Sequence, residues 1–453
     1  GGGNSFVTVV TLQKTLTSSF TAFNFNGLAP LPAPVEGGAG ADVLNGTSAI
    51  DVLNGNGGDD VLTGGAGNDV LNGGAASDVL DGGAGDDVLN GGSGAQGDTA
   101  TYASATAGVN VNLAIVGNQQ DTGGSGFDSL TGIEHLVGSA FTDELRGDGF
   151  ANRLTDTSGG NDFLRGEAGD DALLIARSGG GAATTVRLNG GDGADSLTFA
   201  GNGRYSDTVT LEGEAGDDLI TVSGAGTVGI DAGAGADTVV YDTLGGAFRI
   251  TLGEGSDTVR LASTGGQFAA SGDNLVRDFA TGPGGDRVDL SAWLAGGALT
   301  NYGGGNPFAD GHMRLVQNGS RTLLQVDRDG GGNGYQTVLA FTNTTAASFT
   351  AANFNGFDPT GLAPMPVESA DKALDAGPQT LPGLADDAFL VLPGETKAAF
   401  EEPLVLPGAG LDGQADRTGV FAFADALPVH LMAMHDRDSL PGGPRDSGQD
   451  DGF

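Results

Sequence analysis

The 453-residue sequence contains no cysteine, and it is poor in basic and in aromatic residues. Without cysteine, neither disulfide bonds nor thiolate metal sites can form, so any cross-link must be of another kind. Lysine and arginine together number 19 against 58 acidic residues, and the formal net charge is −39. A chain with this charge repels nucleic acid and anionic membrane surfaces. We therefore expect no nucleic-acid partner.

Long apolar runs are also missing from the sequence. No run reaches the roughly 18 apolar residues that a membrane-spanning helix requires, and no basic stretch followed by an apolar one forms a signal peptide. We predict that the chain does not span a membrane and that its export, if it occurs, depends on another signal.

The motifs of common hydrolases are absent as well. There is no His-Glu-x-x-His helix and no Gly-x-Ser-x-Gly elbow, and the four histidines are isolated from one another. Adjacent carboxylates such as Asp59 and Asp60 point to opposite faces of a strand, so they cannot easily act as acid and base on one substrate. We expect no enzymatic activity in this chain.

Glycine and aspartate are abundant. The 85 glycines indicate a repetitive fold rather than an ordinary compact core. The carboxylates repel one another, so a compact state needs counter-charge, and hard divalent cations with oxygen ligands supply it most effectively. Calcium is therefore the first metal to consider.

Six uninterrupted nonapeptides run from Gly37 to Asn90. Each contains the phrase Asp-Val-Leu in the same phase, with aspartate at the sixth position and leucine at the eighth. Glycine dominates the first, second and fourth positions, where it permits the positive φ of tight turns whose carbonyls converge. The sixth-position residues are Asp42, Asp51, Asp60, Asp69, Asp78 and Asp87.

The Asp-Val-Leu phrase is a short strand whose leucine faces one side and whose valine faces the other. Such a strand cannot bury its leucine alone, so two nonapeptides must form one coil in a stack of parallel strands. The aspartate of one repeat and the glycine carbonyls of the repeat two places on then share an edge, which offers about six oxygen ligands suited to calcium. A flexible glycine-rich linker is the alternative, and the fixed phase argues against it.

The array resembles the nonapeptide G-G-x-G-x-D-x-U-x of hemolysin-type, or RTX, proteins, which bind calcium in a parallel β-roll. Residues 64–72 and 82–90 match this pattern fully, whereas Thr47, Ala49 and Ala76 replace glycines in the second and fifth repeats. Those two turns are expected to hold calcium weakly or not at all. The resemblance implies calcium as the cofactor, bound by the six aspartates and by the turn residues Gly38, Gly40, Gly58, Gly65, Gly67, Gly83 and Gly85.

Beyond the array, the aspartate phase returns at intervals of about one coil. We interpret residues 37–98 as the calcium-binding β-roll and residues 99–270 as a degenerate β-solenoid that keeps its calcium turns mainly on one edge. The further metal ligands expected there are Asp162, Asp171, Asp195, Asp218, Asp237 and Asp257.

Residues 271–360 contain the single tryptophan, Trp293, and less glycine. They resemble the capping and secretion-target domain of the family, and a cap has a physical reason because the end of a solenoid exposes an unpaired strand edge. This segment contains four acidic residues in or next to loops, which either bind further metal ions or serve as turn or capping residues. They are Asp286, Asp289, Asp327 and Asp329.

The two ends of the chain differ from the repeats. Residues 1–30 and 330–359 are identical at sixteen of thirty positions, so we interpret residues 1–36 as the end of a preceding module and a proline-rich linker, in a protein with tandem modules. Residues 361–453 form an acidic, proline-rich tail that we predict to be disordered. The resemblance implies that type I secretion machinery reads an uncleaved signal near such a C-terminus.

The sequence thus predicts an all-β protein, a parallel β-roll or β-solenoid with a β-rich cap and a disordered tail. Its expected function is that of a calcium-binding repeat module of a secreted, extracellular bacterial protein, which folds on calcium binding after export. One alternative is a calcium-stiffened spacer of a large adhesin, biofilm or surface-layer protein that contacts other cell-surface components. Another is the C-terminal region of an exported protease or lipase whose catalytic domain lies elsewhere.

Overall fold

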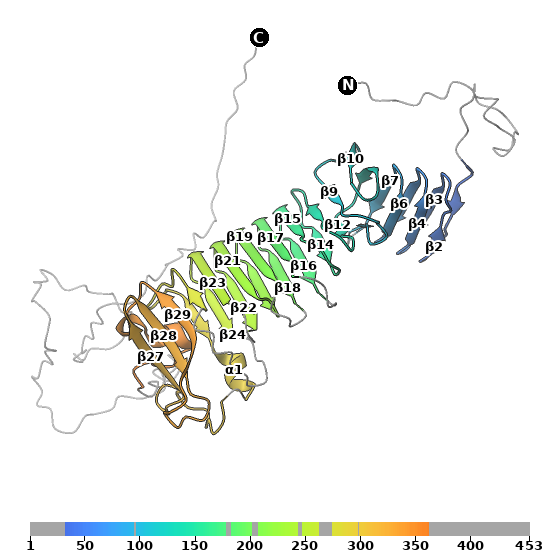
Figure 1. The fold of residues 1–453 in the computed structure, drawn as a ribbon. Coiled ribbons are helices and arrows are strands. Elements are labelled where there is room, and N and C mark those ends of the chain that lie inside the picture. Colours follow the sequence, from blue (N-terminus) through green and yellow to red (C-terminus); the bar gives the residue numbers. More distant parts are fainter. Residues whose placement is uncertain are drawn as a thin grey trace, which may run out of the picture. The chain divides into compact units, whose positions relative to one another are not determined.

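The computed structural model describes residues 32–94, 97–177, 183–201, 207–242, 247–261, 274–297 and 299–361. Most of the expected preceding module and all but the first residue of the expected tail lie outside these ranges. Figure 1 shows strands stacked one after another, with a single short α-helix among the described residues. Nearly all strand pairs are parallel, which confirms the predicted all-β solenoid.

Two sheets form the first part of the solenoid. The first sheet is six-stranded and has the order β1 (Val35–Glu36), β3 (Val52–Gly57), β5 (Val70–Ala75), β7 (Val88–Ser93), β11 (Phe127–Thr131) and β10 (Gln119–Asp121). The second sheet is twelve-stranded and begins with β2 (Val43–Asn45), β4 (Val61–Ala66), β6 (Val79–Ala84) and β8 (Thr99–Thr101). Successive strands of the chain alternate between the two sheets.

The register of these strands gives the length of a coil. Strand β3 pairs with β5 so that Leu53 faces Leu71, and β4 pairs with β6 so that Leu62 faces Leu80. Partners are therefore two nonapeptides apart, and every position of a repeat stacks on the same position one coil away. Two nonapeptides form one coil, as the period predicts.

The leucines of the repeats form the core. Leu53, Leu62, Leu71 and Leu80 have an exposed fraction of 0%, whereas the exposed fraction of the preceding valine reaches 69% at Val43. The apolar stripe is only one residue wide on each strand, so the interior of the array is thin. Each leucine still contributes about 1.5–3 kcal/mol by leaving water.

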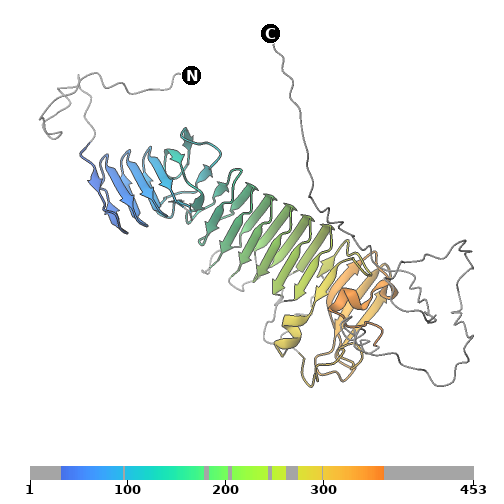
Figure 2. The ribbon, with the colours of Figure 1, turned by 180° about the vertical axis from the view of Figure 1, so that it is seen from behind.

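The twelve-stranded sheet continues without a break through the degenerate region. Its later strands are β12 (His135–Val137), β14 (Arg153–Asp156), β16 (Ala172–Ala176), β18 (Ser196–Ala200), β20 (Leu219–Ser223), β22 (Thr238–Asp242), β24 (Thr258–Leu261) and β26 (Arg287–Asp289). Figure 2 shows the same succession of coils from behind.

The opposite sheet is replaced partway along. Strand β11 pairs in parallel with β7, and β10 pairs antiparallel with β11, so the first sheet ends there. A third, eleven-stranded sheet then begins with β9 (Asn110–Asn112), β13 (Glu144–Arg146), β15 (Phe163–Ala168), β17 (Thr185–Asp192), β19 (Thr208–Ala215), β21 (Thr227–Ala234), β23 (Ala247–Glu254) and β25 (Leu275–Val276).

The later coils have a thicker core than the array. Strand β19 buries Val209 and Leu211, and β20 buries Ile220 and Val222, so each strand contributes two apolar side chains. Such a strand needs less help from a metal ion to bury enough apolar surface.

Antiparallel strands close the third sheet. Strands β27 (Met313–Asn318), β28 (Arg321–Val326) and β29 (Gln336–Thr342) form a meander, and β29 pairs in parallel with β25. The rest of this segment holds α1 (Ser291–Ala295) and the 3-10 helices η3 (Ala346–Ser348) and η4 (Ala351–Phe354). This segment also holds a cluster of aromatic rings with neighbouring centroids 4.7–5.6 Å apart, formed by Phe279, Phe308, Phe341, Phe349 and Phe354.

No helix in the described ranges has the length and apolar character needed to cross a membrane.

Candidate calcium sites

A column of acidic residues runs along one edge of the solenoid, directly before the strands of the twelve-stranded sheet. Oδ1 of Asp60 accepts a hydrogen bond of 2.7 Å from the backbone N–H of Asp42, one coil earlier. The N–H of Asp60 donates in turn to Oδ1 of Asp78, and that of Asp78 to Asp98, both at 2.8 Å. One carboxylate oxygen of each repeat therefore fixes the stacking of the coils.

The same column continues beyond the array. The backbone N–H groups of Asp171, Asp195 and Asp218 donate hydrogen bonds of 2.8 Å to the carboxylate one coil further on. Those of Asp237 and Asp257 do the same at 2.9 and 3.0 Å, and Asp286 is the last acceptor. The aspartates that recur about every 20 residues in the sequence thus lie on one edge.

Two members of this column are not aspartates. The N–H of Asp98 donates to Oε2 of Glu134 at 2.8 Å, and the N–H of Asn152 donates to Oδ1 of Asp171 at 2.7 Å. Sequence reasoning did not identify either residue, because both lie in repeats whose glycines are largely replaced. The only signal was their spacing of 18 residues.

A shorter column lies before the strands of the opposite sheet. The N–H groups of Asp51, Asp69 and Asp87 donate to the carboxylates of Asp69, Asp87 and Asp128 at 2.8–3.0 Å. After the change of sheets, the N–H of Asp143 donates to Asp162 at 2.9 Å.

The second carboxylate oxygen distinguishes two kinds of turn. In ten turns of the described chain, Oδ2 of the repeat aspartate is buried and has no hydrogen-bond partner from the protein. A buried carboxylate oxygen without a partner costs free energy unless a cation or a donor reaches it. The ten residues are Asp60, Asp69, Asp78, Asp87, Asp98, Asp171, Asp195, Asp218, Asp237 and Asp257.

Burial changes the acidity of these groups. Desolvation, with hydrogen bonding opposing it and neighbouring carboxylates adding to it, raises the pKa of Asp171, Asp218 and Asp257 to about 7. The same causes raise the pKa of Asp98 and Asp195 to about 6. Without a cation, the folded protein thus holds carboxyl groups that are partly protonated near neutral pH, and a bound cation reverses this preference.

The first glycine of each repeat keeps space open beside Oδ2. A Cβ atom at Gly55 would lie 2.2 Å from Oδ2 of Asp60 and 2.6 Å from the carbonyl oxygen of Gly73. At Gly166 the corresponding distances are 2.2 Å to Oδ2 of Asp171 and 2.5 Å to the carbonyl oxygen of Gly190. A carboxylate oxygen and a backbone carbonyl of the next coil therefore border one small space that only glycine leaves free.

The glycines predicted as ligands form further rows of carbonyls. Gly58, Gly65, Gly67, Gly83 and Gly85 all have positive φ. A Cβ at Gly83 would lie 2.0 Å from the carbonyl oxygen of Gly65, and one at Gly85 would lie 1.8 Å from that of Gly67. These carbonyls therefore point along the stack toward the next coil.

Residues other than glycine also have positive φ at the second or fourth position of several repeats. Ala76 has a φ of 86°, and Asn56, Glu167 and Glu214 also lie in the left-handed region. The turn of the fifth repeat thus keeps its shape despite Ala76, and Oδ2 of Asp78 in that repeat is free of protein partners.

In other turns, Oδ2 itself has a partner from the protein. Oδ2 of Asp42 accepts from the N–H of Gly38 in the first repeat, where neither Gly38 nor Gly40 has positive φ. Oδ2 of Asp51 accepts from the N–H and the hydroxyl of Thr47 at 2.6 and 2.9 Å.

Two turns of the degenerate region close in the same way. Ser139 donates its N–H and its hydroxyl to Asp143, both at 2.6 Å. The N–H of Asp148 donates to Oδ1 of Asn152 at 2.7 Å.

The acidic residues near the end of the solenoid have protein partners. Asp286 accepts from the N–H of Ala280 at 2.7 Å through its second oxygen. Asp289 receives hydrogen bonds from Ser291 and Arg260, which outweigh its desolvation and lower its pKa to about 2. Asp327 accepts from two backbone N–H groups of its own loop. These residues have the geometry of turns.

The donor set fits a hard divalent cation. We call the ten turns with a free Oδ2 open turns. Each open turn offers carboxylate and carbonyl oxygens in a repeated arrangement, together with an uncompensated negative charge. Neither sulfur nor imidazole takes part. Calcium generally takes about six to eight oxygen ligands in a flexible geometry, so oxygens from such turns suit it. Fold and site together define a calcium-binding parallel β-roll.

Comparison with known families agrees with this class. The model of the RTX calcium-binding nonapeptide repeat matches residues 36–71, 63–95 and 147–174. The chain therefore contains hemolysin-type (RTX) repeats, which are calcium-binding repeats of a structural rather than a catalytic fold. No curated protein matches the chain.

Proposed function

We propose that this chain is the calcium-binding repeat module of a type I-secreted extracellular bacterial protein, and that it folds when calcium binds after export. The observation that carries the proposal is the row of buried aspartate oxygens without protein partners. Proteins with RTX repeats are typically secreted, which supports the extracellular location. Type I secretion machinery is the partner that this route requires.

The proposed mechanism is a balance between repulsion and binding. Without calcium, stacked carboxylates one coil apart repel one another and lose hydration, so the unfolded, threadable chain is favoured. Calcium binds the folded state alone and stabilises it by about 2.7 kcal/mol per site at 100 times Kd. Several such sites together exceed the usual stability of a domain, about 5–15 kcal/mol.

The proposed ligands follow from the two kinds of turn. Aspartates with a free Oδ2 bind calcium together with carbonyls of the turn glycines and of the next coil. Asp42 and Asp51, whose Oδ2 atoms already accept backbone hydrogen bonds, contribute weaker sites. The turn of Ala76 belongs with the strong sites because Asp78 retains its free oxygen.

We also propose the division of the chain into a β-roll over 37–98, a degenerate solenoid over 99–270 and a cap over 271–360. The cap protects the end of the stack, since Asn353 and Asn355 donate hydrogen bonds to Asp286 and Asp289 at the two ends of β26, the last strand of the twelve-stranded sheet. Its role as a secretion target, and a signal within 361–453, are parts of the same proposal.

A calcium titration of the full chain tests this function. Far-ultraviolet circular dichroism should show a cooperative gain of β signal with calcium and no comparable gain with magnesium, which retains its water and prefers octahedral sites. A chain that is fully folded in chelator and unchanged by calcium would refute calcium-dependent folding.

A spacer role in a large surface protein is the second candidate, in which the module contacts other cell-surface components. The identity between residues 1–30 and 330–359 favours it, because tandem modules are typical of spacers. Sequencing of the coding region upstream distinguishes the candidates: further modules support a spacer, and a zinc-protease or lipase motif supports the C-terminal region of an exported enzyme.

A further inference from the structure

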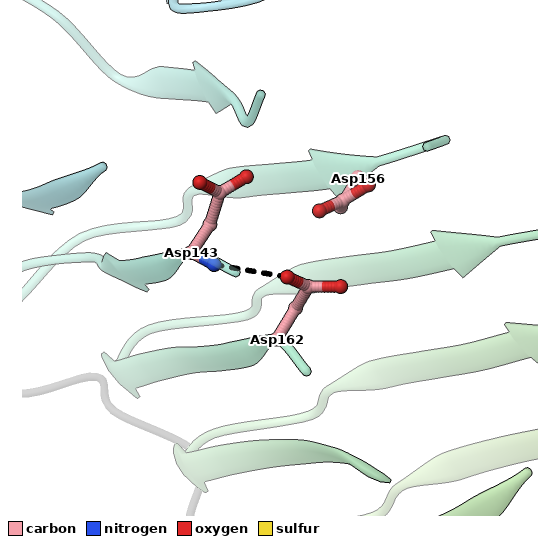
Figure 3. A group of neighbouring side chains, drawn as sticks. All are labelled: Asp143, Asp156 and Asp162. Carbon is pink, nitrogen blue, oxygen red and sulfur yellow. Dashed lines mark hydrogen bonds between the residues drawn. The ribbon is translucent and has the colours of Figure 1, made fainter. Parts of the chain in front are cut away.

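Three buried carboxylates gather where the third sheet begins, and Figure 3 shows them. Asp143 and Asp162 directly precede β13 and β15, and Asp156 ends β14. Each residue offers one oxygen, and these oxygens lie within 4.8 Å of one another. Asp156 takes the place of the first glycine of its repeat, and its side chain has an exposed fraction of 0%.

A buried arginine lies against this cluster. The Arg177 side chain has an exposed fraction of 5%, and its Nη2 forms an ion pair with Oδ2 of Asp162. Its Nη1 lies 3.4 Å from Oδ1 of Asp156. The same guanidinium donates to the carbonyl oxygens of Ser158 at 2.5 Å and of Gly160 at 3.3 Å.

Arg177 thus binds the same kinds of oxygen, carboxylate and carbonyl, that an open turn offers to a cation. In the turn of Asp171, Oδ1 accepts from the backbone one coil earlier and Oδ2 has no protein partner. In the turn of Asp162, Oδ1 accepts from the N–H of Asp143 in the same way, but Oδ2 and two turn carbonyls are bonded to Arg177. Both turns lie in one matched stretch of RTX repeat, residues 147–174.

We propose that the guanidinium of Arg177 takes the place of a calcium ion in the turn of Asp162, so that this turn closes without metal. The proposal rests on the proposed function, since it assumes that the open turns bind calcium. A guanidinium is always charged and presents five donors in a planar fork, so it can satisfy a carboxylate and two carbonyls at once.

The neighbouring turns extend this interpretation. Ser139 closes the turn of Asp143, and Asp148 closes that of Asn152. The repeat residues of three successive turns therefore have protein partners, and in this cluster only Oδ2 of Asp156 is left without one. They lie at the level where the third sheet begins. The solenoid thus contains a metal-independent joint between two stretches whose turns have free carboxylate oxygens.

Bound calcium per chain, measured by equilibrium dialysis on matched variants, tests the proposal. Asp162→Asn should bind as many ions as the parent chain, whereas Asp171→Asn should bind at least one fewer. Both asparagines keep an amide oxygen that can accept the stacking hydrogen bond, so the fold is retained in either variant. Arg177→Gln should bind one more ion than the parent, because the carboxylates of Asp156 and Asp162 then lack their cation.

Loss of an ion in Asp162→Asn equal to that in Asp171→Asn would overturn the proposal. So would an unchanged ion count in a folded Arg177→Gln. If Arg177→Gln does not fold, the comparison of the two aspartate variants decides alone. A parent chain that binds no calcium would refute the proposed function itself. A parent chain that binds calcium, with variant counts other than those expected, would refute only the role of Arg177.

Discussion

The backbone N–H of Asp195 donates a hydrogen bond of 2.8 Å to Oδ1 of Asp218, one coil further along the chain. Oδ2 of Asp218 is buried and has no partner among the described residues. The two oxygens of one carboxylate therefore have separate roles, since one holds the coils in register and the other is left for a cation. Asparagine can replace the first role but not the second.

Asp218→Asn should thus change stability in opposite directions with and without calcium. In chelator, removal of a buried charge should stabilise the folded chain by about 1–3 kcal/mol; in calcium, loss of a ligand should destabilise it by a similar amount. The urea midpoint in saturating calcium measures the second change, and the concentration of the osmolyte TMAO that folds half of the chain in chelator measures the first. Asp217→Asn is the control, because Asp217 is exposed and bonded through Oδ1 to Ala236. A change of the same sign in both conditions would contradict the prediction.

The stability of the calcium-free chain should fall as pH rises. Burial raises the pKa of Asp257 from 3.8 to about 7, and that of Asp171 likewise. A carboxyl group with a higher pKa in the folded state binds its proton more tightly there, so folding is least penalised below pH 3.8 and most penalised above pH 7. The midpoint concentration of TMAO that folds the chain in calcium-depleted buffer should therefore be lower at pH 5 than at pH 7.5.

Calcium should reverse this trend. Protons compete with calcium for the same carboxylates, so the calcium concentration at half-folding should increase as the pH falls from 7.5 to 5. A midpoint that is independent of pH in either condition would show that these aspartates do not titrate in the range that their burial predicts.

Gly166→Ala should weaken calcium binding and stability together. The added Cβ would lie 2.2 Å from Oδ2 of Asp171, so the turn must shift, at a cost of about 1–3 kcal/mol. Gly229→Ala is the matched control, because a Cβ there meets nothing within 4 Å and φ is not positive. Equal calcium midpoints for the two variants would disprove the role of the space beside Oδ2.

Ala76→Gly should stabilise the fifth repeat. Ala76 has a φ of 86°, a conformation that costs an L-residue roughly 1–2 kcal/mol and glycine almost nothing. Part of this gain is lost because glycine has more freedom in the unfolded chain, so a net increase of about 1 kcal/mol in the free energy of unfolding is expected. Urea unfolding in saturating calcium measures it, and a decrease in stability would contradict the prediction.

Much of this fold follows from the sequence because the repeat is strict. The repeat has a period of nine residues with leucine always at the eighth position. This period determines the length of the coil, the strand register in which Leu62 faces Leu80, and the residues of the core. The recurrence from Asp195 to Asp257 likewise predicts one column of carboxylates. Local spacing is sufficient wherever each coil repeats the previous one.

The remainder depends on contacts that spacing does not reveal. Arg177 follows Asp162 by 15 residues and reaches it only because β16 returns the chain to the same edge. Glu134 and Asn152 take part in the column of hydrogen bonds although neither is an aspartate, because the coil places them at the same edge. The antiparallel pair of β10 and β11, which ends the first sheet, depends on the folding of an insertion that has no repeat phase.

The unbroken twelve-stranded sheet has a mechanical consequence. Strands β8, β12 and β14 pair in series across the level at which the opposite sheet changes, so backbone hydrogen bonds bridge that level on one face. On the opposite face, isolated hydrogen bonds connect β9 with the segment of β10, among them the one from the N–H of Gly124 to the carbonyl oxygen of Gly108 at 3.0 Å. A tensile load along the stack is therefore carried at this level by one regular ladder and a few single bonds, instead of by two ladders. We therefore expect the stack to bend more readily at the change of sheets than between two regular coils.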